Sequence, residues 1–188
     1  AAFGGVTAAL VVDRDRRARA PKPPRVVRLL AHAAIDDVDR AWLAEATGQP
    51  RDRLARIDDL GQLAIAAVAT LVARVGRDAI RGAGIVAGYA LATLDTNARF
   101  HRRLIDKGAT RVDPRLFPAT TPNAGAGHVA IIWGLTGPCF AVGAGLDGGI
   151  EALCAAAELI AAGDADRMLV VSADDMGPAS RAWLEACA

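Results

Sequence analysis

The chain has 188 residues, 53% of them hydrophobic, and a formal net charge of +1. That content suffices for one buried core, and the near-neutral balance argues against nucleic acid or an anionic membrane as a partner. No apolar run has membrane-spanning length and the N-terminus lacks the basic opening of a signal peptide, so we expect a cytoplasmic protein. Because Cys139, Cys154 and Cys187 lack metal-ligand spacing, we expect reduced, mostly buried thiols and no bound metal.

The first half of the chain predicts alternating strands and helices. Residues 4–12 are small, apolar and uncharged, which indicates a buried strand, and the Arg- and Pro-rich residues 13–28 indicate a solvated loop. Apolar residues at helical spacing predict helices over 36–47 and 57–75, the second capped by Asp58 or Asp59. Residues 84–91 form an apolar run typical of a core strand.

A helix is predicted over residues 96–107. Asn97, Phe100, His101 and Leu104 share one face of it, at spacings of three, four and seven residues from the first. Such a face either packs on the subunit core or points into a cavity or an interface, and the spacing alone does not choose between these alternatives.

The stretch from 118 to 166 organises the rest of the chain. It predicts a helix over 125–135, a strand over 139–145 and a helix over 149–162, and a strand over 168–173 follows after a turn. Repeated strand–helix–strand units with short turns imply right-handed crossovers. We therefore expect an α/β fold in one domain over 1–188, with a mostly parallel or mixed sheet covered by helices.

The turn after residues 139–145 is an elbow that presents one side chain at a helix N-terminus. Free backbone N–H groups and the helix dipole stabilise an anion there, so in an enzyme the presented residue would be a Cys or Ser nucleophile. Here it is Leu146, which has no nucleophilic atom. Asp147 is expected to satisfy the N–H groups, and Cys154, two turns into the helix, is expected to be packed.

Motifs between residues 84 and 174 together resemble the N-terminal half of the β-ketoacyl synthases, which have a thiolase-like fold. Phe117–His128 is similar to the family's P-x-x-x-x-N-x-x-A-G-H passage, Trp133–Pro138 to its aromatic-G-L-x-G-P turn, and Glu158–Asp166 to its I-x-x-G-D-A-D helix end. Their combination is specific, although each alone is weak. The resemblance implies a thiolase-like half-fold without the family's C-terminal half.

Two departures from the family's pattern concern the chemistry. The family's nucleophilic cysteine falls at Leu146, and Cys139 lies seven positions earlier. The family also takes two histidines and a lysine from its C-terminal half, and His32, His101 and His128 resemble none of these. The resemblance therefore implies no catalysis by this chain alone, and no cofactor of its own.

Non-catalytic members of this superfamily include the chain length factors, or ketosynthase-β subunits, of type II polyketide synthases, and the short polyene-type form is the best match. This resemblance implies a heterodimer with a catalytic ketosynthase that elongates phosphopantetheine-bound acyl chains, with an acyl carrier protein touching the complex transiently. The implied interface strand is Cys139, Phe140, Ala141, Val142, Gly143, Ala144 and Gly145. The residues implied to floor the acyl tunnel are Thr93, Asn97, Phe100, His101 and Leu104.

Three other interpretations remain open from the sequence. The chain could be a stand-alone acyl-binding or scaffold protein with a ketosynthase half-fold. It could be an enzyme, such as a thioesterase or decarboxylase, that uses His101 or His128. It could also be a fragment of a longer protein.

Overall fold

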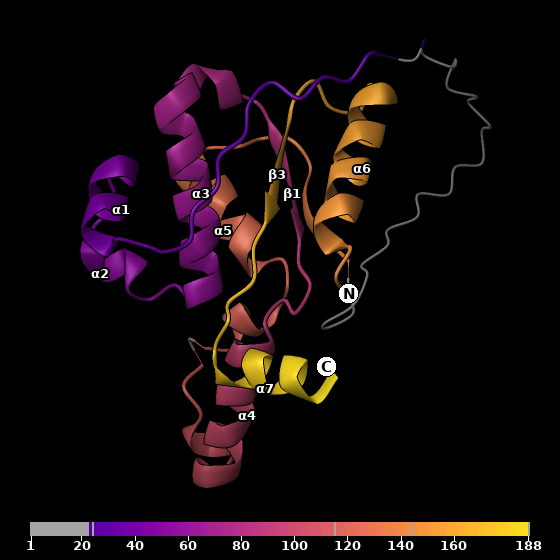
Figure 1. Cartoon of the computed structure of the whole chain (residues 1–188). Helices are drawn as coiled ribbons and strands as arrows, with labels where there is room; N and C mark the ends of the chain where they lie inside the picture. Colours follow the sequence, from indigo (N-terminus) through magenta and orange to yellow (C-terminus); the bar gives the residue numbers. More distant parts are fainter. Residues whose placement is uncertain (1–22, 24, 115, 144, 188) are drawn as a thin grey trace, which may run out of the picture.

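The computed structural model describes residue 23 and residues 25–187 except 115 and 144 (Figure 1). The strand predicted over 4–12 therefore lies outside the described residues. The described elements are, in order, α1 (Arg40–Thr47), α2 (Arg51–Leu54), α3 (Asp59–Val75), η1 (Arg77–Ile80), β1 (Gly84–Gly88), α4 (Leu94–Lys107), η2 (Ala109–Arg111), η3 (Pro118–Thr120), α5 (Ala124–Trp133), β2 (Cys139–Val142), α6 (Gly148–Ala161), β3 (Met168–Ser172) and α7 (Pro178–Cys187).

The described strands form a parallel sheet in the order β2-β1-β3. Val86 of the central strand pairs with Phe140 on one side and Val170 on the other. All five residues of β1 are buried, as expected for a parallel strand covered on both faces. The predicted α/β class is confirmed, and in the described part of the chain every strand pair is parallel.

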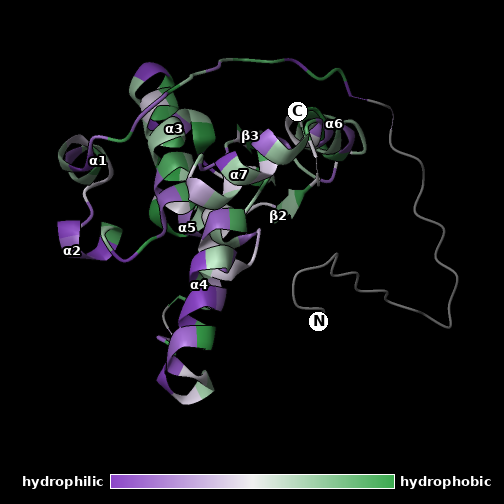
Figure 2. Cartoon of the chain, turned by 60° about the horizontal axis from the view of Figure 1, so that its bottom comes forward, coloured by the Kyte–Doolittle hydropathy of each residue, from purple (hydrophilic) through white to green (hydrophobic). Residues whose placement is uncertain are grey.

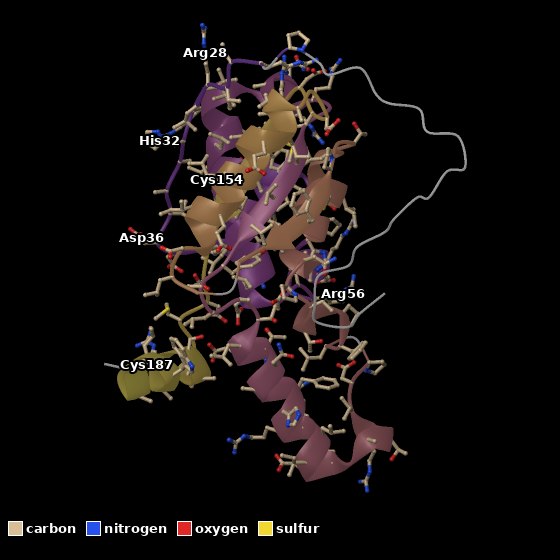
Figure 3. The ribbon with its side chains drawn as sticks, turned by 90° about the vertical axis from the view of Figure 1, so that its right-hand side faces the viewer. Arg28, His32, Asp36, Arg56, Cys154 and Cys187 are labelled. Carbon is tan, nitrogen blue, oxygen red and sulfur yellow. The ribbon has the colours of Figure 1, made fainter. Side chains whose placement is uncertain are left out.

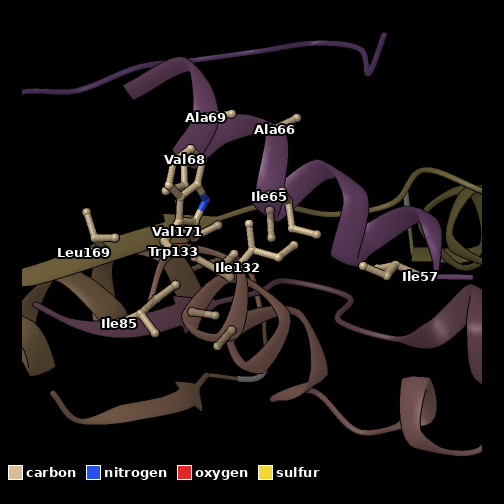
Figure 4. Close-up of a cluster of buried hydrophobic side chains, with 14 of the residues drawn as sticks. Ile57, Ile65, Ala66, Val68, Ala69, Ile85, Ile132, Trp133, Leu169 and Val171 are labelled. Carbon is tan, nitrogen blue, oxygen red and sulfur yellow. The ribbon is translucent and has the colours of Figure 1, made fainter. Parts of the chain in front are cut away.

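Helices cover the two faces of the sheet unequally. The helices α3 and α5 pack together on one face, whereas α6 lies on the other (Figure 1). Most of the core lies on the α3/α5 side, where Ile65, Ile85 and Trp133 meet (Figure 4). The core on the α6 side is small, with Val86, Ala152 and Ala156 as its buried members.

The helix predicted over 36–47 begins only at Arg40, because Asp39 ends the preceding extended segment as an N-cap. Its carboxylate accepts hydrogen bonds from the backbone N–H groups of Ala41 (2.8 Å) and Trp42 (3.2 Å). Gly48 ends the same helix in the left-handed conformation at φ 66°, which glycine adopts without a steric penalty.

The helix α4 leaves the end of β1 and projects away from the sheet (Figure 1). Asp95 in its first turn fixes the start of α7, because its carboxylate accepts hydrogen bonds from the backbone N–H groups of Ala179 (2.7 Å) and Ser180 (3.1 Å) and from the Ser180 hydroxyl. Burial acts to raise the pKa of Asp95, but these hydrogen bonds outweigh it and the pKa is lowered.

The prediction of mostly buried cysteines is wrong. Cys139, Cys154 and Cys187 are all exposed and none forms a disulfide. Figure 3 shows Cys154 on α6 and Cys187 at the end of α7. Cys154 is not packed because the alanines at 152 and 156 form the side of α6 that meets the sheet.

In the part of the chain that the structure describes, no helix has the length and apolarity to cross a membrane.

Candidate functional site

The elbow between β2 and α6 is built from glycines. Gly143 has φ 86° and Gly145 has φ 127°, both in the region that side chains rarely adopt. A Cβ atom added to Gly143 would lie 2.7 Å from the Cα of Gly148 and 2.9 Å from a carboxylate oxygen of Glu151. The backbone therefore turns back sharply onto the first turn of α6, as the sequence predicts.

The first turn of α6 sits directly on the carboxyl ends of the strands. A Cβ atom on Gly148 would clash with the backbone of Tyr89, and one on Gly149 would lie 2.6 Å from the hydroxyl of Ser172. A Cβ atom added to Gly88, at the end of β1, would lie 2.0 Å from the carbonyl oxygen of Gly148. The small residues at these positions fix where the elbow presents its side chain.

The presented side chain is that of Leu146, which is 83% exposed. It offers neither a nucleophile nor a hydrogen-bonding group to a substrate. Asp147 occupies the N-cap position, but its side chain makes no capping hydrogen bond, so the expectation that it caps the helix is wrong. Its backbone, at φ −88° and ψ 2°, departs from the extended conformation typical of a capping residue.

The cysteines near the elbow do not replace the missing nucleophile. Cys139 lies at the start of β2, the end of the strand that is distant from the elbow. Burial raises the pKa of its thiol, which disfavours the reactive thiolate. Cys154 lies in the second turn of α6 and is exposed.

A second structured region follows β1. The carboxylate of Asp174, just after β3, accepts hydrogen bonds from the backbone N–H groups of Ala90 (3.0 Å), Leu91 (2.7 Å) and Ala92 (3.1 Å). Ala92 has a positive φ of 51°, which an alanine adopts only when its surroundings enforce it. Sequence reasoning missed Asp174, although an acidic residue directly after a predicted strand is a signal for such a role.

Three of the predicted tunnel residues contact the segment that returns from α4 to α5. The Thr93 hydroxyl donates to the Thr120 carbonyl at 2.9 Å, and the Asn97 amide donates to the same carbonyl at 3.2 Å. Phe100 packs against Phe117, with ring centroids 5.8 Å apart. These contacts hold the return segment, here defined as residues 109–122, against α4.

The remaining two predicted tunnel residues differ in exposure. Leu104 is half-buried on α4. His101 is exposed and borders a shallow hollow that Ala98 and Ile105 also line. Sequence reasoning identified Phe100 but missed Phe117, its partner, because only the fold brings the return segment onto α4.

A buried polar cluster lies where α3, α4 and α5 meet. The Thr96 hydroxyl donates to the carboxylate of Asp58 at 3.3 Å. Burial raises the pKa of Asp58 and lowers that of His128, and the charge of Asp58 partly offsets the lowering at His128. No group of three His, Cys, Asp or Glu side chains in the described part of the chain is placed to hold a metal ion.

The predicted interface strand lies at an edge of the described sheet. β2 pairs with β1 along one side, in the order β2-β1-β3. Cys139 and Gly143 are exposed and Phe140, Ala141 and Val142 are half-buried, while Ala144 lies outside the described residues.

Comparisons with known proteins agree with this geometry. Residues 6–187 match the family model of the β-ketoacyl synthase N-terminal domain. The chain is 35% identical over 91 residues to 3-oxoacyl-[acyl-carrier-protein] synthase 2 of Vibrio cholerae, an alignment that covers 48% of this chain and 22% of that protein. It is 32% identical over 130 residues to nodulation protein E of Rhizobium leguminosarum bv. trifolii, covering 66% of this chain and 32% of that protein.

Solved structures show the same fold. A chain of the ishigamide ketosynthase/chain length factor matches with a TM-score of 0.64 at 31% identity, covering 78% of this chain and 41% of that one. A chain of the AntDE:AntF complex, a type II polyketide synthase acyl-carrier protein with its ketosynthase, matches with a TM-score of 0.61 at 22% identity, over 80% of this chain and 43% of that one. The chain thus spans less than half the length of these relatives. It belongs to the β-ketoacyl synthase N-terminal domain family and is similar to ketosynthase/chain length factor complexes.

Proposed function

We propose that this chain is a non-catalytic, ketosynthase-like subunit of the chain-length-factor type. The observation that carries the proposal is Leu146, which stands 83% exposed where the elbow would present a nucleophile. The glycines around it keep the elbow's tight geometry, so the fold is retained while the reacting atom is absent. Claisen condensation by this chain alone then has no covalent acyl intermediate.

We infer that the partner is a catalytic ketosynthase that joins the edge of β2 to which no other described strand pairs. A parallel sheet with an unpaired edge strand offers backbone N–H and C=O groups to a second chain. The exposed Cys139 begins this strand, and the three residues that follow it are only half-buried. The match to a chain of the ishigamide ketosynthase/chain length factor supports such a pair.

The proposal gives the α4 region a role in setting acyl chain length. Phe100 and Phe117 form a bulky pair, and Thr93 and Asn97 hold the return segment in place beside it. A rigid aromatic wall of this kind stops a growing acyl chain by steric contact. In this account the partner acts on acyl chains carried by phosphopantetheine on a carrier protein, in a cytoplasmic type II system of the polyene-forming kind.

Co-expression with a candidate catalytic ketosynthase tests the proposal, with native mass spectrometry as the readout. The expected result is a one-to-one complex. Replacing the exposed Cys139 of β2 by aspartate should weaken it by placing a charge at the sheet edge, whereas replacing the exposed Ile131 of α5 by aspartate serves as the matched control and should not. A chain that stays monomeric beside its ketosynthase would contradict the proposal.

A further inference from the structure

The helix α4 is fixed to the rest of the chain at its start. Its buried residue is Thr96, which lies in the first turn. Figure 2 shows α4 as mainly hydrophilic, with α7 beside its base. Because the rest of the helix buries little apolar surface within the chain, contacts at the base set the direction in which α4 projects.

A small tilt at this base displaces the residues that follow it. Phe100 comes five residues after Asp95, which is about 8 Å along the helix axis at 1.5 Å per residue. A tilt of about 10° at Asp95 therefore moves Phe100 by about 1.4 Å, and it moves Leu104, about 14 Å along the axis, by about 2.4 Å. A packed aromatic wall loses contacts when it shifts by that much.

Asp95 caps the helix α7. Pro178 is the first residue of α7 and has no backbone N–H, so Ala179 and Ser180 occupy the second and third helical positions. These are the N–H groups that a capping side chain normally satisfies, and both donate to the Asp95 carboxylate, at 2.7 and 3.1 Å. The cap is thus supplied by another helix, 84 positions away from Ala179 in the sequence.

The contact between Asp95 and α7 is enclosed. Ser180 is fully buried, and its hydroxyl donates to the same carboxylate as its backbone N–H. A Cβ atom added to Gly177 would lie 2.5 Å from the carboxyl carbon of Asp95. The carboxylate therefore has one favourable orientation, because any other would leave a buried donor unpaired.

The segment 174–180 holds the base of α4 at both of its ends. At one end, Asp174 accepts hydrogen bonds from the backbone N–H groups of residues 90–92, the loop that leads into α4. At the other end, the start of α7 binds Asp95 in the first turn of α4. The position of the aromatic pair, Phe100 and Phe117, thus depends on a segment that contributes no side chain to the pair.

We propose that Asp95 and Ser180 are positioning residues for acyl chain length. They hold α4 at the angle that places the Phe100–Phe117 pair, and they act through this pair without touching the acyl chain. The inference rests on the proposed function, because it concerns the region to which that function assigns the choice of chain length.

Product length separates positioning from stability. The chain would be assembled with a catalytic ketosynthase, and mass spectrometry would give both the total product and its distribution of lengths. A variant that only weakens folding lowers the total and leaves the distribution as it was. In Asp95→Ala, the share of the main product should fall by at least about twofold and longer chains should replace it, because the aromatic wall is no longer held in place.

Three further variants complete the experiment. Ser180→Ala removes the hydroxyl and keeps both backbone hydrogen bonds, so it should shift the distribution in the same direction by less. Glu185→Ala, at an exposed position of α7, is the control for loss of an acidic side chain and should leave the distribution unchanged. Phe100→Ala alters the aromatic pair directly and is the positive control.

The outcomes distinguish the inference from the proposed function. A shift in Phe100→Ala with an unchanged distribution in Asp95→Ala would overturn the inference and leave the proposed function standing. If Asp95→Ala does not assemble, Ser180→Ala decides, and an unchanged distribution there would overturn the inference. If no complex forms, or if Phe100→Ala also leaves the lengths unchanged, the proposed function fails and the inference fails with it.

Discussion

Asp174 holds the loop that connects the sheet to α4, and its removal gives a quantitative test of the site's construction. Its two carboxylate oxygens accept hydrogen bonds from three consecutive backbone N–H groups, at 2.7 to 3.1 Å. A hydrogen bond to a charged group contributes about 1.5–3 kcal/mol, and bonds that share one acceptor are not additive. We therefore expect Asp174→Ala to lower the free energy of unfolding by about 3 kcal/mol.

The aspartate-to-asparagine change separates geometry from charge at the same position. One carboxylate oxygen accepts from both Leu91 and Ala92, and an amide oxygen can retain these two bonds. The amide NH₂ would face the N–H of Ala90, so we expect Asp174→Asn to cost about 1–2 kcal/mol.

Urea unfolding followed by circular dichroism measures these losses. With a slope of about 2 kcal/mol per molar, a loss of 3 kcal/mol moves the midpoint down by about 1.5 M. Asp106→Ala, on the exposed side of α4, is the matched control and should move it by less than about 0.3 M. If the urea midpoint of Asp174→Ala also moves by less than about 0.3 M, the three hydrogen bonds do not hold the loop and the reasoning is refuted.

Three further predictions follow from the described contacts. Gly148→Ala places a Cβ against the Tyr89 backbone and should destabilise the chain by at least about 3 kcal/mol or prevent folding. In the control, Gly127→Ala in α5, the added Cβ meets nothing within 4 Å, so the change should be neutral or stabilise by up to about 1 kcal/mol. Soluble yield and urea midpoints compare the two variants. Burial lowers the pKa of His128 below 6.5, so the unfolded chain takes up a proton at this residue more readily than the folded chain. The free energy of unfolding should therefore fall as the pH drops below 6.5, until the pH passes the lower folded pKa. His128→Gln should flatten that part of the stability–pH curve, and an unchanged slope would refute the assignment. With the catalytic partner present, Phe100→Ala should shift the products towards longer chains, because it opens the aromatic pair. Arg103→Ala on the exposed side of α4 is the control and should leave product length unchanged. If mass spectrometry finds the same product lengths for Phe100→Ala, Phe100 does not line the tunnel.

Local patterns in the sequence predicted the layered fold and the elbow well. The apolar run at 84–91 and the small residues at 143–149 identify the central strand and the turn because backbone geometry there leaves few alternatives. The predicted strands at 84–91 and 139–145 both run three residues too long, since the apolar pattern continues into the loops that follow.

Contacts between distant segments were beyond the reach of the sequence. The pairing of Phe100 with Phe117 and the capture of three N–H groups by Asp174 depend on how the chain returns to the sheet, and no local spacing encodes that. The exposure of Cys154 was missed for a related reason. A helix that is apolar all round does not reveal from spacing alone which side meets the sheet.

The most direct test of the central claim is to find which subunit carries an acyl group. The assembled pair would be incubated with an acyl thioester of the carrier protein, and the intact mass of each subunit would be measured. The account predicts that the ketosynthase gains the acyl mass and that this chain, with Leu146 at its elbow, gains none. A stable acyl adduct on this chain would contradict it.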